Sequence, residues 1–257
     1  MSFKEFTETR TYRAGFLCTI FSVCALACGL LLSGCVVTED LGLNSTTGGT
    51  SRTDLVIMDF FSEVLEDMSA FMPSNSDETI TDAAVKDFAN NLSNADNTTD
   101  VTYRKIPTSE NSAYEIDFTF KNLQQLFRDL GGGAEQTVLT VAQNGGNTTL
   151  RLNLSMDNYD QLTKIIPFLA DPNFEVWGPV YNVGETEENY LEMMSYILSE
   201  DGPPAIQNSL ITLRFKTPSA IKSQTNGRII DSTTFEYSFP LIDFLLLANP
   251  LTFSVSW

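Results

Sequence analysis

The chain has 257 residues, with 33 Asp and Glu against 15 Lys and Arg, a formal charge of −18 and no histidine. Such an acidic chain cannot neutralise phosphates, so its composition argues against binding to nucleic acid. The lack of histidine excludes Ser-His-Asp and Cys-His catalysis, histidine-ligated zinc and a histidine pH switch.

The first 35 residues have the order of an export signal. An apolar run covers 14–32, small residues follow, and the basic residues that precede it are Lys4, Arg10 and Arg13. The run ends in Leu32-Ser33-Gly34-Cys35, which resembles the lipobox of bacterial lipoproteins. The resemblance implies that residues 1–34 are a signal peptide cleaved after Gly34, with a diacylglycerol on the sulfur of Cys35 and usually a further acyl chain (palmitate) on its amine.

This resemblance implies an address in the bacterial cell envelope. Two or more acyl chains anchor a protein stably in a lipid bilayer, so the protein is expected to be lipid-anchored, on a periplasmic face or at the cell surface. The alternative is an uncleaved anchor, because the apolar run is near the roughly 20 residues that span a bilayer.

Cleavage would remove Cys18, Cys24 and Cys28 and leave 223 residues with 12 basic and 31 acidic side chains, a formal charge of −19. That length suits one domain, or one domain with a helical appendage. The mature chain would have no disulfide, no free thiol and no histidine, and we expect neither a cofactor nor a bound transition metal.

Two segments are expected before the main domain. Residues 35–53 are predicted to be the lipidated cysteine followed by a flexible tether, because they are rich in Gly, Ser, Thr and Asn and show no periodicity. Random-coil scaling gives the 18 residues after Cys35 a reach of about 20–25 Å. Residues 54–98 predict a helical pair packed on the main domain, with helices over 54–72 and 79–92 from apolar residues at three- and four-residue steps.

The polar residues 93–100 predict a loop, in which Asn94, Asp96 and Asp100 are the residue types of a calcium loop. The EF-hand pattern fails, since Thr99 replaces the required Gly and Lys105 the distal Glu. We expect an ordinary solvated loop here.

Residues 99–257 predict an α+β domain, an antiparallel sheet with helices on one face. Alternating residues indicate strands near 101–103, 114–120, 136–142, 148–155, 211–215, 235–239 and 251–257. Helical patterns cover 122–130, 157–169, 187–198 and 240–247. The turn Asn144-Gly145-Gly146 is a clear hairpin signal.

The last strand carries a structural prediction of its own. Leu251, Phe253, Val255 and Trp257 alternate with polar residues. We expect this strand to pair inside the sheet and its apolar face to close the core.

The stretch from Arg214 to Leu246 resembles the C-terminal part of LppM-type bacterial lipoprotein domains. Pro218, Asn226 and Gly227 match the turns of that family, while Phe235 and Tyr237 lie where it has a tryptophan. The resemblance implies an envelope lipoprotein domain without a catalytic assignment.

These features favour a non-enzymatic binding or envelope-assembly module. It would contact the lipid bilayer through acylated Cys35 and bind an envelope protein or a small ligand. The sequence does not specify which. The alternative is a carboxylate-dependent, glycosidase-like hydrolase of the envelope. Its acid pair would come from Glu185, Glu187, Glu188 and Glu192, or from Asp157 and Asp160.

Overall fold

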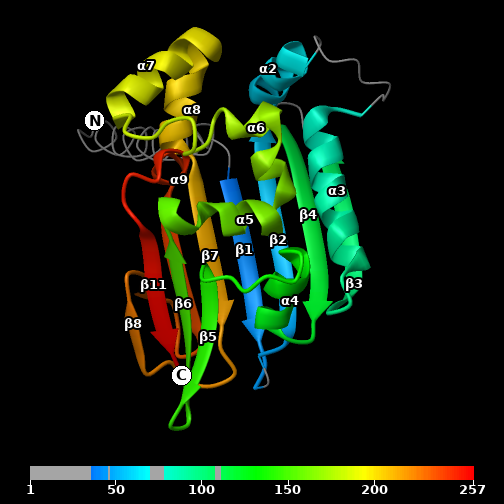
Figure 1. Ribbon diagram of the computed structural model, residues 1–257, viewed down its shortest axis with the longest axis vertical. Coiled ribbons are helices and arrows are strands. Elements are labelled where there is room, and N and C mark those ends of the chain that lie inside the picture. The colour runs from blue at the N-terminus through cyan, green and yellow to red at the C-terminus, as the bar shows by residue number, and fades with distance from the viewer. Residues whose placement is uncertain (1–35, 46, 70–77, 108–110) are drawn as a thin grey trace, which may run out of the picture. The chain divides into compact units, whose positions relative to one another are not determined.

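Residues from 36 to the C-terminus build two β-sheets and a set of short helices (Figure 1). The computed structural model describes residues 36–45, 47–69, 78–107 and 111–257. The predicted signal peptide and Cys35 lie outside the described residues. The predicted α+β class is confirmed, with a large, mainly antiparallel sheet.

The larger sheet has seven strands in the order β3-β4-β2-β1-β7-β10-β9. All its neighbouring strands run antiparallel except β1 and β7, which are parallel. Its strands are β1 (Val36–Leu43), β2 (Gly49–Met58), β3 (Thr98–Pro107), β4 (Asn111–Phe120), β7 (Leu210–Lys216), β9 (Arg228–Ile229) and β10 (Thr234–Pro240).

The predicted flexible tether is wrong. Residues 36–43 and 49–53 belong to strands β1 and β2, and β1 is the middle strand of the larger sheet. Leu41 and Leu43 of β1 are buried, which a tether would not permit. Gly49 allows the two strands to approach at their turn, because a Cβ there would overlap the carbonyl oxygen of Gly42.

The smaller sheet confirms the prediction for the end of the chain. Its order is β5-β6-β11-β8, so the last strand pairs on both sides. The four apolar side chains of its alternation are all buried. The predicted hairpin joins β5 and β6, and Gly145 and Gly146 in its turn have φ values of 56° and 81°. The strands are β5 (Leu139–Asn144), β6 (Asn147–Leu154), β8 (Ser223–Thr225) and β11 (Leu251–Ser256).

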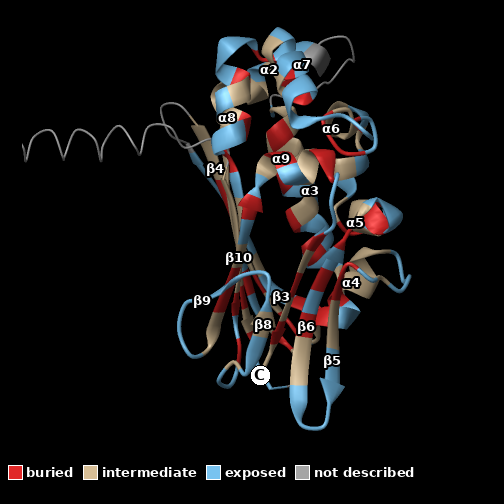
Figure 2. Cartoon of the chain, turned by 90° about the vertical axis from the view of Figure 1, so that its left-hand side faces the viewer, coloured by how far each residue is buried: buried red, intermediate tan, exposed pale blue. Residues whose placement is uncertain are grey.

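The smaller sheet and helices such as α4 and α5 lie on one side of the seven-stranded sheet, which we call its inner side; the other side is its outer face (Figure 2). Helices α2, α7 and α8 lie beyond one end of the strands. Helix α3 packs along β3 at the sheet edge. The helices are α2 (Asp59–Ser69), α3 (Ile80–Asn94), α4 (Leu123–Leu130), α5 (Tyr159–Ile165), α6 (Pro172–Glu175), α7 (Glu187–Ile197), α8 (Gly202–Asn208) and α9 (Leu241–Leu246).

The predicted N-terminal helical pair stays a prediction, because residues 70–77 between α2 and α3 lie outside the described residues. Its start is corrected: residues 54–58 complete strand β2, and α2 begins at Asp59.

Aromatic side chains join the two sheets. The ring of Phe253 on β11 lies 5.1 Å from that of Phe215 on β7 and 5.2 Å from that of Phe235 on β10, between ring centroids. Tyr237 lies 5.3 Å from the same ring. Phe215, Phe235 and Phe253 are each at most 2% exposed, so this cluster is the apolar centre that fixes the sheets together.

Candidate functional site

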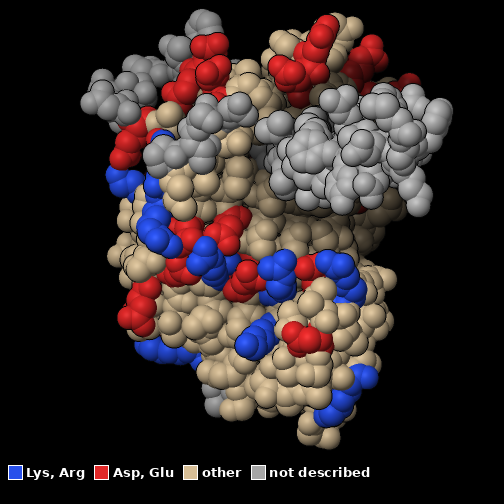
Figure 3. All heavy atoms as spheres, turned by 180° about the vertical axis from the view of Figure 1, so that it is seen from behind, with Lys and Arg blue, Asp and Glu red and all other residues tan. Residues whose placement is uncertain are grey.

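The outer face of the seven-stranded sheet carries most of the ordered ionic contacts of the described residues. Strand partners project to the same face of a sheet, so the register aligns charged residues in two adjacent rows, which we call the charged rows. One contains Arg104, Glu115 and Asp54; the other contains, strand by strand, Asp117, Arg52, Asp40, Arg214, Glu236 and Arg228. Figure 3 shows this band of alternating sign across the sheet.

One half of the band is centred on Glu115 of β4. Its side chain is only 5% exposed and forms ion pairs with Arg104 of β3 and Arg52 of β2. The guanidinium of Arg52 also binds Asp54, with 3.0 Å between Nε and Oδ2. Two arginines therefore cover a carboxylate that would otherwise be buried without a counter-charge.

The other half is centred on Glu236 of β10. Its side chain is 7% exposed and binds Arg214 at 3.1 Å and Arg228 at 2.5 Å. Burial alone would raise the pKa of Glu236, but the hydrogen bonds and charges of Arg228 and Arg214 outweigh burial and hold that pKa below its ordinary value. Arg214 also contacts Asp40 of β1 at 3.0 Å, which links strands separated by 174 positions.

A groove of about 550 Å³ lies beside this band. Its walls include Arg52, Arg214 and the exposed Lys216 as cations, with hydroxyl side chains between them. The remaining polar lining residues are Asp40, Thr50, Ser51, Asp100, Asp117, Thr119 and Thr234. A groove of this size and polarity can hold a small ligand, or a segment of a partner, that carries charges of both signs.

The inner side of the same strands holds an unusual carboxyl group. Glu39 of β1 accepts hydrogen bonds from Ser51 Oγ and Thr53 Oγ1, each 2.5 Å long. Burial raises the pKa of Glu39 from 4.5 to about 7; the two hydroxyl donors oppose this rise, and the charges of Asp40 and Asp54 add to it. Among the carboxyl groups that the structure describes, Glu39 therefore has the strongest reason to be protonated near neutral pH.

A second groove, of about 710 Å³, runs between α3 and residues 167–174. Phe88, Phe168 and Phe174 line it together with Asp87 and Asp171. Its charged lining residues are all acidic, which distinguishes it from the groove on the outer face.

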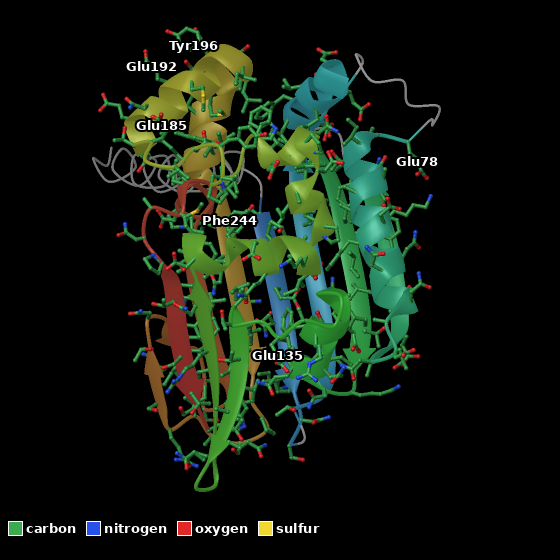
Figure 4. The ribbon with its side chains drawn as sticks, viewed as in Figure 1. Glu78, Glu135, Glu185, Glu192, Tyr196 and Phe244 are labelled. Carbon is green, nitrogen blue, oxygen red and sulfur yellow. The ribbon has the colours of Figure 1, made fainter. Side chains whose placement is uncertain are left out.

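The residues predicted for a hydrolase do not meet at either groove. Glu187, Glu188 and Glu192 are exposed on α7, and Glu185 is exposed just before it; Figure 4 shows Glu185 and Glu192 pointing away from the body of the domain. Asp157 and Asp160 are also exposed, and Asp160 binds Lys164 at 2.9 Å. Within the described ranges, no three Asp, Glu, Cys or His side chains gather as a metal would require.

Sequence reasoning missed the residues of the charged rows. A signal was present: Arg52 and Asp54, and likewise Glu115 and Asp117, occupy alternate positions in their strands. The pattern could place these residues opposite the apolar face, but it could not show which strands would be neighbours.

Comparisons with known proteins add a weak structural similarity. No protein-family model matches the chain, and no curated protein matches it either. One solved structure is similar, the folded domain of the Mycobacterium tuberculosis LppM protein determined by NMR, with 11% identity, a TM-score of 0.40, and coverage of 87% of this chain and 90% of that domain. In the part of the chain that the structure describes, no helix is long and apolar enough to cross a membrane.

Proposed function

We propose that the protein is a bacterial envelope lipoprotein, anchored by acylated Cys35, whose domain binds a polar partner or ligand through the groove on its outer face and catalyses no reaction. The observation that carries the binding role is the band of paired charges beside a groove of about 550 Å³. A site of this kind recognises a partner whose positive and negative groups lie opposite its own negative and positive groups. Such contacts increase the specificity of binding and the association rate.

Anchoring is supported by the Leu32-Ser33-Gly34-Cys35 motif and by the apolar run over 14–32 that precedes it. Metabolic labelling with a fatty acid tests it. The parent protein should incorporate the label and fractionate with membranes, whereas Cys35→Ser should not be labelled. Equal incorporation by the Cys35→Ser protein would refute the assignment of Cys35.

The binding role can be tested with a photo-crosslinking amino acid placed at Lys216, on the wall of the groove. The matched position is Lys164, an exposed lysine of α5 that does not line this groove. We expect crosslinking in whole cells to one defined species from position 216 and not from 164, and its loss when Arg214→Gln is added. Identical products from both positions would contradict a binding groove.

A further inference from the structure

The residue that follows the proposed lipidation site begins the middle strand of the larger sheet. Val36 is the first residue of β1 and pairs with Val56 of β2 and Leu210 of β7. Consecutive Cα atoms are about 3.8 Å apart, so the Cα of Cys35 lies within that distance of a sheet residue. An acyl group on Cys35 would therefore hold this end of the outer face at the bilayer surface, without an intervening linker.

The same end of the outer face is apolar. The residues in register with Val36 on the neighbouring strands form an unbroken apolar row: Ile106, Ala113, Val56, Val36, Leu210 and Pro240. This apolar row crosses six strands, or about 24 Å at about 4.8 Å a strand. Ile106 and Leu210 are each 45% exposed, so side chains that would normally be covered face outward.

The charged rows next to the apolar row are close to neutral, which is compatible with a position near anionic lipid headgroups. The charged rows lie two and four residues farther along the strands, about 7 and 13 Å from the apolar row. They hold four arginines against five carboxylates, a net −1, although the chain after residue 34 carries −19. A surface close to neutral avoids the repulsion that anionic lipid headgroups would exert on the rest of this acidic protein.

We propose that the apolar row lies against the lipid bilayer beside the acylated Cys35 and orients the domain with its outer face toward the headgroups. This inference rests on the proposed lipid anchoring. The outer-face groove would then open within reach of the membrane surface, which makes a partner bound at that surface the expected occupant. Tyr196 on α7 is 82% exposed as well, but α7 carries three glutamates and neither Lys nor Arg, so anionic headgroups would repel that helix.

Depth-dependent fluorescence quenching tests this orientation. The processed protein would keep only Cys35, with an acylated sulfur, so a cysteine introduced by Ile106→Cys or Leu210→Cys can be labelled alone with an environment-sensitive fluorophore. Tyr196→Cys is the matched control, an exposed apolar position on α7. The acylated proteins are reconstituted into phosphatidylethanolamine–phosphatidylglycerol vesicles containing a lipid with a spin label near the headgroup.

We expect quenching at positions 106 and 210 to be several-fold stronger than at 196. If the protein floats with the vesicles but positions 106 and 210 are not quenched more than 196, the orientation is refuted and anchoring stands. If the parent protein does not float with the vesicles, or carries reactive thiols from an uncleaved leader, anchoring through a processed and acylated Cys35 fails and the orientation fails with it.

Discussion

The carboxyl of Glu39, a half-buried residue on the inner side of β1, makes a quantitative prediction about stability and pH. In the folded protein its pKa is raised from 4.5 to about 7, chiefly by burial. The folded state therefore keeps a proton on Glu39 over a pH range in which the unfolded chain has lost it. The free energy of unfolding should fall as pH rises from about 4.5 to 7, and the full cost should be present above pH 7.

The size of the effect follows from that shift. A rise from 4.5 to about 7, at about 1.36 kcal/mol for each pH unit, corresponds to about 3 kcal/mol. Glu39→Gln removes the ionisation but keeps the shape: its carbonyl oxygen can accept from one of the hydroxyls of Ser51 and Thr53, and its NH2 group can donate to the other. The variant should therefore gain up to about 3 kcal/mol over the parent between pH 5 and pH 8.

Urea unfolding followed by circular dichroism, at several pH values from 5 to 8, measures this gain. The control is Glu188→Gln, which removes an exposed carboxyl on α7. The comparison of each variant with the parent at the same pH cancels the contributions of the other titrating groups. If the difference between Glu39→Gln and the parent is the same at pH 5 and pH 8, Glu39 does not titrate with a raised pKa and the reasoning is wrong.

Two further predictions concern the fold. Deleting residues 251–257 should abolish cooperative thermal unfolding, because four buried side chains at about 1.5–3 kcal/mol each compare with a total stability of about 5–15 kcal/mol; Ser254→Thr should melt within a few degrees of the parent. Arg214→Met should lower the free energy of unfolding, measured in urea at pH 7, by about 1–2 kcal/mol, because it leaves the buried Glu236 with Arg228 alone. The control Lys164→Met removes one partner of an exposed ion pair on a helix and should lower it by less than about 0.5 kcal/mol.

Local patterns predicted much of the fold from β4 onward. The alternation over 114–120, the Asn144-Gly145-Gly146 turn and the last strand each depend on neighbours in sequence, and the structure has all three. Pairing between distant strands leaves no such local trace. The division into two sheets and the parallel contact of β1 with β7 could not be derived from periodicity.

The missed strand β1 has a specific physical cause. Its inward positions are Val37, Glu39, Leu41 and Leu43, so the period-two pattern is present but interrupted by one carboxylate. An acid in the middle of a short run suggests a polar segment, and the following Gly, Ser and Thr residues reinforced that interpretation. The hydroxyls of Ser51 and Thr53, which accommodate Glu39, were part of the composition that indicated a tether. Because the groove is built on β1 and β2, the candidate site was missed together with the strands.

The absence of a tether leads to a last prediction about orientation. Eight residue pairs with β2 and seven with β7 fix β1 in the sheet, so a lipid on Cys35 would restrict both the distance and the orientation of the domain. Inserting 18 Gly and Ser residues between Cys35 and Val36 would add a reach of about 20–25 Å and restore the freedom that the sheet removes. The protein with the insertion should still float with vesicles. Quenching of a label at position 106 should fall toward that at 196, because direct attachment to Cys35 gives the apolar row a high effective concentration at the bilayer, and a long linker lowers it. Unchanged quenching would mean that the apolar row binds the bilayer strongly by itself and that direct attachment is not what orients the domain.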